Sequence, residues 1–330
     1  MKSRVHAFGL VCGGMALTGC KDVQSSLVPH GPSAAQIATL SWILFAGAAV
    51  ILLIVLSACW LAMRGPHAAR ARLAGATAVI VGGVAFPVLT LSALLAYGVW
   101  LTHARVQTPT HQDMIRIEVR GEQWWWRVSY RGADGQLFES ASEIHMPAGQ
   151  PVAFVLTSPD VIHSFWVPNL GGKVDMIPGR TTHLRLQADR PGVFRGQCAE
   201  YCGGPHALMA LEVVAMPPED FAAWLASQAR PAAPAQSEVE QRGQALFVTA
   251  GCGACHAVRG TEATGVVAPD LTHIGSRRSV GVDTLPLTAA NLQRFIVAGQ
   301  HIKPGNRMPP FRIFNDAELE ALSIYLASLR

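Results

Sequence analysis

"GQCAEYCGGPHALM" occupies residues 196–209 and holds two cysteines, a histidine and a methionine. Three roles are open for Cys198 and Cys202: a disulfide, a catalytic thiol pair or a pair of metal ligands. A disulfide is the usual state of closely spaced cysteines in an exported protein. His206 and Met209 favour metal, because thiolates, an imidazole and a weak thioether on one loop are what copper requires in an electron-transfer site. The stretch therefore predicts a copper-binding loop that joins two strands of a rigid β-sandwich.

A further histidine ligand must come from an earlier strand. The candidates are His145, His163 and His183. His163 lies in "SPDVIHSFWVPNL", directly after the apolar run "PVAFVLTS" at residues 151–158. A side chain at that position can point at the copper loop, so the pattern favours His163 and leaves the other two open.

Two stretches resemble the binuclear copper (CuA) domain of cytochrome c oxidase subunit II. They are "VIHSFWVPNLGGKVDMIPGR" at residues 161–180 and the loop at residues 196–209, in which the motif Cys-x-Glu-x-Cys-x3-His-x2-Met is complete. The resemblance implies that the thiolates of Cys198 and Cys202 bridge two copper ions. The metal ligands that it implies are His163, Cys198, Glu200, Cys202, His206 and Met209.

Glu200 and Met209 are the weak ligands in this resemblance. The Met209 sulfur and the Glu200 backbone carbonyl complete the coordination, and the Glu200 carboxylate helps to hold a magnesium ion at the contact with subunit I. Protein then fills every position on the copper ions, unlike a catalytic metal, which keeps one position open. The site is therefore expected to carry electrons rather than to bind a substrate.

"GEQWWWRVSY" at residues 121–130 matches the aromatic stretch of the same family. Trp124 falls on the tryptophan through which electrons are thought to reach the copper site. Large rings in a strand also supply core and interface area, and aromatic runs are common in strands. Electron port and packing residue both remain open for Trp124. Trp125, on the opposite face of the strand from its neighbours, is expected only to pack.

"GCGACHAV" at residues 251–258 contains Cys252-x-x-Cys255-His256, the attachment signal of a c-type haem. The two thiols add to the haem vinyl groups, and the adjacent imidazole binds the iron from one face. A thioredoxin-like cysteine pair is the alternative, but that motif lacks the histidine and lies in a βαβ unit. The pattern therefore predicts covalent haem.

The second axial ligand of this haem is argued by elimination. Met308, in "GNRMPPF", is the only methionine after Met216. A thioether ligand raises the haem potential, as suits an electron carrier. His273 and His301 are the rivals, but solvent-facing polar roles are expected of them.

Residues 238–330 resemble class I cytochromes c from end to end. Gly243 and Phe247 in the first helix and Tyr325 in the last match the family's crossing-helix contact. Pro269 matches the residue whose carbonyl accepts a hydrogen bond from the haem-binding histidine and so orients it.

Two long uncharged segments, residues 36–63 and 73–101, each exceed the ~20 residues that cross a bilayer as a helix. The short loop between them carries Arg64, Arg70 and Arg72, which predicts that it stays cytoplasmic. The outer ends of both helices, and everything after them, are then expected on the opposite side of the membrane.

The N-terminus has the pattern of an export signal. Lys2 and Arg4 precede a short apolar run that ends in "LTGC". With a cysteine at the cleavage point, this resembles a bacterial lipoprotein signal, which predicts removal of residues 1–19 and a lipid anchor at Cys20. An ordinary signal peptide that is cut nearby is the alternative.

The chain is expected to be a multidomain membrane protein. Its parts are a two-helix transmembrane hairpin, a cupredoxin-like all-β sandwich or barrel, and an all-α cytochrome c domain. Short alternating runs between Gly and Pro predict the β domain, and "SQARPAAPAQS" reads as an extended linker. The expected boundaries are 1–19 for the signal, 20–109 for the hairpin, 110–226 for the copper domain, 227–237 for the linker and 238–330 for the cytochrome domain.

The composition indicates membrane-spanning segments and argues against nucleic acid as a partner. Charged residues make up 15% of the chain and hydrophobic residues 50%. Residues 110–226 hold 9 Lys and Arg against 13 Asp and Glu, and residues 238–330 hold 9 against 8. Neither domain has the basic excess that nucleic acid binding requires.

The two resemblances imply the electron-accepting subunit of a terminal haem-copper oxidase in a bacterial inner membrane, with the copper and haem domains on the periplasmic side. Electrons are expected from an external donor, such as a cytochrome c or a quinol–cytochrome c reductase. They pass to the haem, to the copper pair and into subunit I, which reduces oxygen to water and pumps protons. Subunit III is a further expected partner. Enzyme activity belongs to the complex, because this chain has no oxygen site.

Three rival functions are weighed against this one. A free-standing, membrane-tethered redox shuttle would use the same cofactors. A nitrous oxide reductase or another copper reductase needs a histidine-rich second metal domain, which the sequence lacks. A quinol oxidase subunit lacks the copper ligands, which this sequence has.

The second membrane segment departs from the family in one respect. Many relatives carry an acidic residue on this helix shortly before a proline. The residues before Pro87 are "AVIVGGVAF", without a carboxylate. A part for this helix in proton uptake therefore has no residue to support it.

Overall fold

The computed structural model describes residues 24–106, 114–132 and 135–330. The predicted signal peptide over residues 1–19 and the predicted lipid anchor at Cys20 lie outside the described residues. The chain divides into two compact units, which are described separately below.

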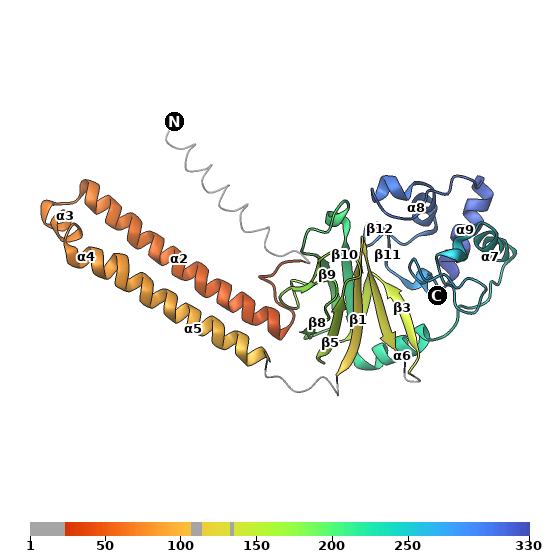
Figure 1. The fold of residues 1–330 in the computed structure, drawn as a ribbon, viewed down its shortest axis with the longest axis horizontal. Coiled ribbons are helices and arrows are strands. Elements are labelled where there is room, and N and C mark those ends of the chain that lie inside the picture. Colours follow the sequence, from red (N-terminus) through yellow and green to blue (C-terminus); the bar gives the residue numbers. More distant parts are fainter. Residues whose placement is uncertain (1–23, 107–113, 133–134) are drawn as a thin grey trace, which may run out of the picture. The chain divides into compact units, whose positions relative to one another are not determined.

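The smaller unit holds the predicted membrane hairpin and includes all but the first turns of its first helix. Figure 1 draws α2 and α5 as two long antiparallel helices joined by shorter ones. The described helices of this hairpin are α2 (Pro32–Arg64), α3 (His67–Leu73), α4 (Ala76–Ile80), the π-helical η2 (Val81–Ala85) and α5 (Phe86–Val106).

Two segments of the hairpin, Pro32–Arg64 and Ala76–Leu101, are long and apolar enough to cross a membrane. Their large side chains face outward, so that Leu53 is 64% exposed and Leu89 is 70% exposed. An apolar surface of this extent is stable against lipid or another apolar partner and unfavourable in water.

The second predicted membrane helix is interrupted where its sequence weakens helical bonding. The backbone of Gly75 is extended, with φ −71° and ψ 145°, and it separates α3 from α4. The π-helical turn η2 ends at Ala85, two residues before Pro87. Proline has no N–H for the bond that an α-helix would make there, and a wider turn accommodates this loss.

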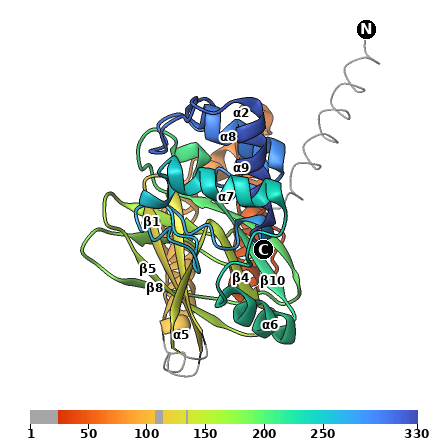
Figure 2. The ribbon, with the colours of Figure 1, turned by 90° about the vertical axis from the view of Figure 1, so that its right-hand side faces the viewer.

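The larger unit contains a β-sandwich of two five-stranded sheets, drawn in yellow and green in Figures 1 and 2. The strand orders are β3-β2-β1-β5-β8 and β4-β10-β9-β6-β7. Both sheets are mixed, because β1 is parallel to β5 and β10 is parallel to β4. The predicted all-β fold of this domain is confirmed. Its elements are β1 (Ile115–Glu122), β2 (Trp125–Arg131), β3 (Leu137–Ala141), β4 (Glu143–Pro147), β5 (Val152–Thr157), β6 (His163–Trp166), β7 (Val174–Met176), β8 (Thr182–Leu186), β9 (Gly192–Cys198), the 3-10 turn η4 (His206–Leu208), β10 (Ala210–Met216) and α6 (Pro218–Gln228).

Alternation along β2 decides which tryptophan enters the core of the sandwich. Trp126, Val128 and Tyr130 are each at most 1% exposed and pack inside. Trp125 and Arg127 lie on the other face, where the Arg127 guanidinium stacks 4.7 Å from the centre of the Trp125 ring. Since successive side chains of a strand point to opposite faces, the neighbouring tryptophans serve different surfaces.

A helical domain follows the sandwich and confirms the predicted cytochrome c fold. Ser237 and Glu240 form a capping box at the start of α7, and Asn315 and Glu318 form another at the start of α9. One small ribbon, β11 with β12, was not expected from the helical pattern. The elements are α7 (Glu238–Thr249), η5 (Cys252–Ala254), η6 (Ile274–Ser276), β11 (Ser279–Val280), β12 (Leu285–Pro286), α8 (Ala289–Ile302) and α9 (Asp316–Ser328).

The first and last helices of this domain cross at a glycine, as expected. A Cβ on Gly243 would overlap the carbonyl oxygen of Ala321 and would lie 2.6 Å from the Tyr325 Cβ. Beside this crossing the rings of Phe247 and Tyr325 meet at 6.1 Å between centroids. The helices are therefore as close as their backbones allow.

Replacing Gly243 by alanine should push α7 away from α9. Overpacking of this kind costs about 1–3 kcal/mol, and we expect the free energy of unfolding of Gly243→Ala to fall by that amount. Guanidinium denaturation followed by circular dichroism measures it. Arg242→Ala, an exposed position on the same helix, is the matched control. Equal unfolding free energies of the two variants would contradict the crossing.

The predicted linker, residues 227–237, is held against the cytochrome domain. The Arg259 guanidinium donates to the carbonyls of Gln228 at 2.6 Å and Ala229 at 3.2 Å. The Ala232 N–H donates to the Arg259 carbonyl at 2.9 Å. The segment forms no helix or strand over residues 231–236, and it is attached to the cytochrome domain because one arginine binds successive carbonyls of it.

Charged side chains join the sandwich to the cytochrome domain. Glu143, which is 3% exposed, accepts the Arg278 N–H at 2.7 Å and a hydrogen bond from His145 Nε2 at 2.8 Å. Arg195 donates to Asp283 at 2.6 Å. Burial alone would raise the pKa of Glu143, but the two hydrogen bonds and the nearby arginine charge lower it below its ordinary 4.5.

The stability of this contact should depend on pH. Because the pKa of Glu143 is lower in the folded protein, its ionisation stabilises the fold above about pH 4.5, and this stability is lost as the pH falls further. Glu143→Gln should lower the unfolding free energy at neutral pH by about 1–3 kcal/mol. On acidification, the unfolding free energy of this variant should fall less than that of the unaltered protein.

Acid titration followed by tryptophan fluorescence checks this expectation. Glu262→Gln, at an exposed position, is the control and should titrate like the unaltered protein. The same loss of stability on acidification in Glu143→Gln and in the control would refute it.

Candidate metal and haem sites

Three strands bring the predicted copper ligands to one end of the sandwich. His163 opens β6 and Cys198 ends β9, and these strands pair so that Phe165 lies opposite Cys198. The loop from β9 to β10 then carries Cys202 and, in η4, His206. Strand pairing on both sides of the loop therefore fixes the points from which the ligands project.

The two cysteines of this loop are free and buried. Their Sγ atoms are 3.8 Å apart, whereas a disulfide bond is about 2.05 Å long. Cys198 Sγ lies 3.8 Å from His163 Nδ1, and Cys202 Sγ lies 3.5 Å from His206 Nδ1. Ligand atoms of His163, Cys198 and Cys202 all fall within 4.8 Å of one another, close enough to share a metal ion. Each sulfur thus has one imidazole beside it.

The two weak ligands of the prediction complete this cluster. The Glu200 carbonyl oxygen lies 3.2 Å from Cys198 Sγ, and Met209 Sδ lies 3.8 Å from Cys202 Sγ. Met209 is fully buried. Two thiols, two imidazoles, a thioether and a carbonyl fit copper, because soft sulfur and imidazole ligands are those that copper takes.

The two thiols differ in acidity. The hydrogen bond from Cys202 lowers the pKa of Cys198 to about 3, against its burial, with a further contribution from His163. The Cys198 sulfur and burial together raise the pKa of Cys202. One thiolate beside one thiol is therefore favoured, and a bound metal would take both sulfurs as thiolates, since only thiolates bind metal.

Asp160 orients His163 and was not found by sequence reasoning. Its carboxylate lies 2.9 Å from His163 Nε2 and accepts the Gln123 N–H at 2.8 Å. The pair leaves His163 Nδ1 directed at Cys198. A Cβ on Gly121 would approach the His163 ring to 3.0 Å, so a larger residue there would press on the ring. An acidic residue three positions before a candidate ligand was the available signal.

The rival histidines lie elsewhere. His145 Nε2 bonds to Glu143, and its ring stacks on Trp224 at 4.2 Å between centroids. His183 is an exposed residue of β8, in the sheet that does not carry the copper loop. The structure brings His163 alone of the three to the cysteines.

Trp124 and Gln123 bind the copper loop directly. Trp124 Nε1 and Gln123 Nε2 each donate to the Cys202 carbonyl at 2.9 Å. Gly203 has φ +105°, and a Cβ there would lie 3.3 Å from the Trp124 ring. The indole therefore contacts the backbone of a predicted copper ligand.

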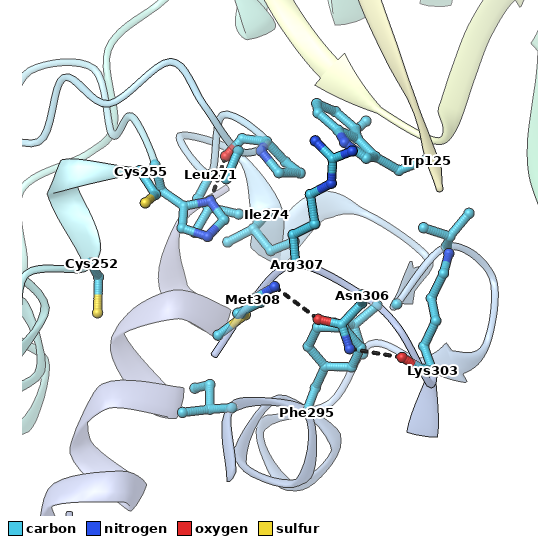
Figure 3. Close-up of a pocket in the computed structure, with 18 of the residues that line it drawn as sticks. Trp125, Cys252, Cys255, Leu271, Ile274, Phe295, Lys303, Asn306, Arg307 and Met308 are labelled. Carbon is cyan, nitrogen blue, oxygen red and sulfur yellow. Dashed lines mark hydrogen bonds between the residues drawn. The ribbon is translucent and has the colours of Figure 1, made fainter. Parts of the chain in front are cut away.

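An apolar cavity of about 320 Å³ lies in the cytochrome domain, with the sandwich forming part of its wall. In Figure 3, Cys252 and Cys255 lie on one side of it and Trp125 and Lys303 on the other. A flat, apolar ring system fits such a cavity. The predicted haem residues that line it are Cys252, Cys255, His256 and Met308.

His256 has the hydrogen bond that the cytochrome resemblance implied. Its Nδ1 donates to the Pro269 carbonyl at 2.7 Å, so Nε2 carries no proton and is available to iron. Burial lowers the pKa of His256, and this favours the neutral imidazole that binds metal.

Met308 lines the cavity and neither rival histidine does. The Met308 N–H donates to Asn306 Oδ1 at 3.0 Å, and its carbonyl accepts from Gln300 Nε2 at 3.1 Å. His301 is exposed, as expected. The expectation of a solvent-facing His273 is wrong. This side chain is 7% exposed and donates from Nε2 to the Arg230 carbonyl at 3.0 Å, so the linker covers it.

Known families match both domains of the larger unit. The profile described as cytochrome c oxidase subunit II, periplasmic domain, matches residues 131–216, and the cytochrome c profile matches residues 240–330. The cytochrome c oxidase subunit 2 of Alkalihalophilus pseudofirmus is 32% identical over 326 residues, which cover 95% of this chain and 94% of that protein. The chain belongs to the cytochrome c oxidase subunit 2 family. Family membership makes it part of an oxidoreductase complex, in which the copper-type and cytochrome domains give it an electron-transfer role.

Other similar proteins match a smaller part of this chain. The cytochrome c oxidase subunit 2 of Bacillus subtilis is 31% identical over 229 residues, or 66% of this chain and 63% of that protein. A crystal structure of the periplasmic domain of subunit II of cytochrome oxidase from Bradyrhizobium japonicum is 31% identical. It covers 36% of this chain and 95% of that one, with a TM-score of 0.34.

Loss of the Asp160 carboxylate should weaken copper binding. Asp160→Asn removes the charge that orients the His163 imidazole, and such partners are worth about 10–100-fold in metal affinity. Competition of the full chain with a chromophoric copper(I) chelator measures this affinity. Asp189→Asn, an exposed aspartate of the same domain, is the control, and an equal affinity of the two variants would contradict the role.

Proposed function

We propose that this chain accepts electrons one at a time from an external donor and delivers them to the oxygen-reducing subunit of a terminal oxidase. The proposed order is cytochrome domain, copper domain, subunit I, where oxygen reduction to water is coupled to proton pumping. The observation that carries the proposal is the shared wall of the two sites: Trp124 and Trp125 line the haem cavity, and Trp124 bonds to the carbonyl of Cys202.

The copper domain would hold a binuclear copper centre. The thiolates of Cys198 and Cys202 are proposed as ligands of both copper ions. Protein groups would also occupy every other ligand position. Bound copper would supply a one-electron couple with no open position for substrate. Strand pairing at both ends of the loop supports the proposal, because a rigid ligand set changes little on reduction. The remaining ligands proposed are His163, Glu200, His206 and Met209.

The cytochrome domain would hold haem c through Cys252 and Cys255, with His256 and Met308 as axial ligands. Bound haem would supply a second one-electron couple, and a methionine ligand would keep its potential high. The Pro269 carbonyl supports this assignment by holding the imidazole in the tautomer that leaves Nε2 to iron.

Trp124 is proposed as the residue through which electrons reach copper. Its indole bonds to the backbone of Cys202 at 2.9 Å, which gives a path of one hydrogen bond from an aromatic ring to a proposed ligand. Its main-chain neighbour Trp125 lines the haem cavity. Packing alone would not require the indole N–H to be directed at that carbonyl.

Glu200 is proposed to face subunit I. Its carbonyl points to Cys198 at 3.2 Å, while its half-exposed carboxylate lies 3.5 Å from Lys173 Nζ. Such a carboxylate could help to hold a magnesium ion shared with subunit I, since magnesium prefers oxygen ligands. Subunit III is a further proposed partner of the assembly.

The proposed topology is a multi-pass bacterial inner-membrane protein. Arg64, Arg70 and Arg72 between the two spans favour a cytoplasmic loop, which puts both redox domains on the periplasmic side. Lipidation of Cys20 would add a second anchor. The proposed domain limits are those predicted from the sequence. The linker is proposed to be bound along the cytochrome domain.

Electron paramagnetic resonance of the copper-loaded full chain tests the copper centre. The expected hyperfine pattern is that of one unpaired electron shared by two copper nuclei. Cys198→Ser should abolish this pattern, while Cys59→Ser, which alters a free cysteine of α2, should retain it. A pattern from a single copper nucleus in the unaltered chain would overturn the proposal.

A membrane-tethered redox shuttle is the second candidate, since the cofactors would be the same. Purification from membranes in mild detergent separates the two. Co-purification with a subunit that carries non-covalent haem and reduces oxygen when the haem c is reduced supports the oxidase. Isolation of this chain alone, with both cofactors in place and no oxygen consumption, supports the shuttle.

A further inference from the structure

Lys303 is a buried lysine that pairs with no carboxylate among the described residues. It is 2% exposed and forms none of the ion pairs among the described residues. Burial lowers its pKa to about 7. It is the only lysine in residues 238–330. Burying an ammonium without a carboxylate is costly, so a requirement other than stability has to explain it.

The ammonium group bridges two carbonyls of the copper domain. Lys303 Nζ donates to the Trp124 carbonyl at 2.6 Å and to the Leu208 carbonyl at 3.0 Å. The first belongs to the peptide that joins Trp124 to Trp125. The second lies one residue before Met209, on the copper loop. Charged and neutral amines both carry the N–H donors for these bonds, so the bridge does not depend on protonation.

The backbone of Lys303 organises the loop that carries Met308. The Lys303 carbonyl accepts from Asn306 Nδ2 at 2.8 Å, and Asn306 Oδ1 accepts the Met308 N–H at 3.0 Å. Figure 3 shows this chain of bonds, with Asn306 between Lys303 and Met308. One residue therefore bonds to the proposed haem loop through its main chain and to the copper loop through its side chain.

Close packing between the same two loops supports this bridge. Gly305 has φ +83°, and a Cβ there would lie 3.3 Å from Pro205 and 3.6 Å from the Trp124 ring. Arg307 donates to the Gln123 side chain at 3.3 Å. The backbone of the loop from Lys303 to Met308 thus lies directly against Trp124. The Trp124 indole bonds in turn to the Cys202 carbonyl.

We propose that Lys303 is a positioning residue for electron transfer within the chain, which holds the Met308 loop on the Trp124–Trp125 peptide so that electrons pass from haem to copper without the domains separating. The inference rests on the proposed function. In this transfer one electron leaves the ferrous haem, which becomes ferric, and enters the copper pair, which is reduced by one electron; no bond forms or breaks.

Lys303→Met in the full, copper- and haem-loaded chain tests the inference. A photoexcited ruthenium bipyridyl complex reduces the haem, and absorbance follows the electron to copper. We expect haem-to-copper transfer to slow by at least ~10-fold, because small misplacements cost that much or more. Haem reduction by the probe, the methionine–iron absorption band and the copper resonance spectrum should not change. Arg312→Met, which removes an exposed cation of the same domain, should leave the transfer rate unchanged.

The outcomes separate this inference from the function on which it rests. An unchanged transfer rate in Lys303→Met, with both spectra intact, would overturn the positioning role and leave the proposed function standing. Absence of haem-to-copper transfer in the unaltered chain would overturn both.

A measurement on the unaltered chain covers the case in which Lys303→Met loses a cofactor. Acylation by an amine reagent should modify Lys303 at least ~10-fold more slowly than Lys173, because the bridge must open first. The side chain of Lys173 is 44% exposed and serves as the internal reference. Equal rates of acylation would show that the bridge does not hold and would overturn the role.

Discussion

The copper domain depends on keeping two sulfurs close together without joining them. Cys198 and Cys202 are buried with their Sγ atoms 3.8 Å apart, too far for a disulfide bond and close enough to share a metal ion. Free thiols at this separation are held by their backbones, since β9 is paired to β6 on one side and to β10 on the other. Asp160 and Gly121 serve the same end, because they fix the ring of His163 against Cys198. A loop between less firmly paired strands would let the sulfurs separate or oxidise.

A single peptide connects this cluster to the haem cavity. The side chain of Trp124 bonds to the carbonyl of Cys202, and its own carbonyl accepts the ammonium of Lys303. Alternation in β2 then directs Trp125 to the outer face, where it lines the cavity, while Trp126 enters the core. The three tryptophans therefore contact three different surfaces: the loop that carries Cys202, the cavity wall and the core of the sandwich.

Charge placement explains how the two domains stay together. The acidic excess of the sandwich has internal partners: Glu143 accepts the N–H of Arg278, and Glu212 accepts from its guanidinium at 3.1 Å. Some of the acidic charge of the sandwich is thus engaged within the chain. The linker adds to this attachment, since Arg259 binds its carbonyls. A fixed interface maintains one distance between two redox sites, whereas a free tether would give a distribution of distances.

The sequence by itself determined the chemistry and the order of the parts. Ligand types, their spacing in the copper loop, the haem attachment motif and the two uncharged segments are local patterns, and local patterns are visible along the chain. The sequence favoured His163 over His145 and His183 as the copper ligand, but it did not show that His273 is covered, or that Asp160, Gln123 and Lys303 take part. Apart from the contact of Asp160 with His163, those facts depend on residues from 35 to 179 positions apart, which are brought together by strand pairing and by the contact of two domains. Only the tertiary structure decides them, because burial and hydrogen-bond geometry belong to the assembled surfaces and not to any one segment.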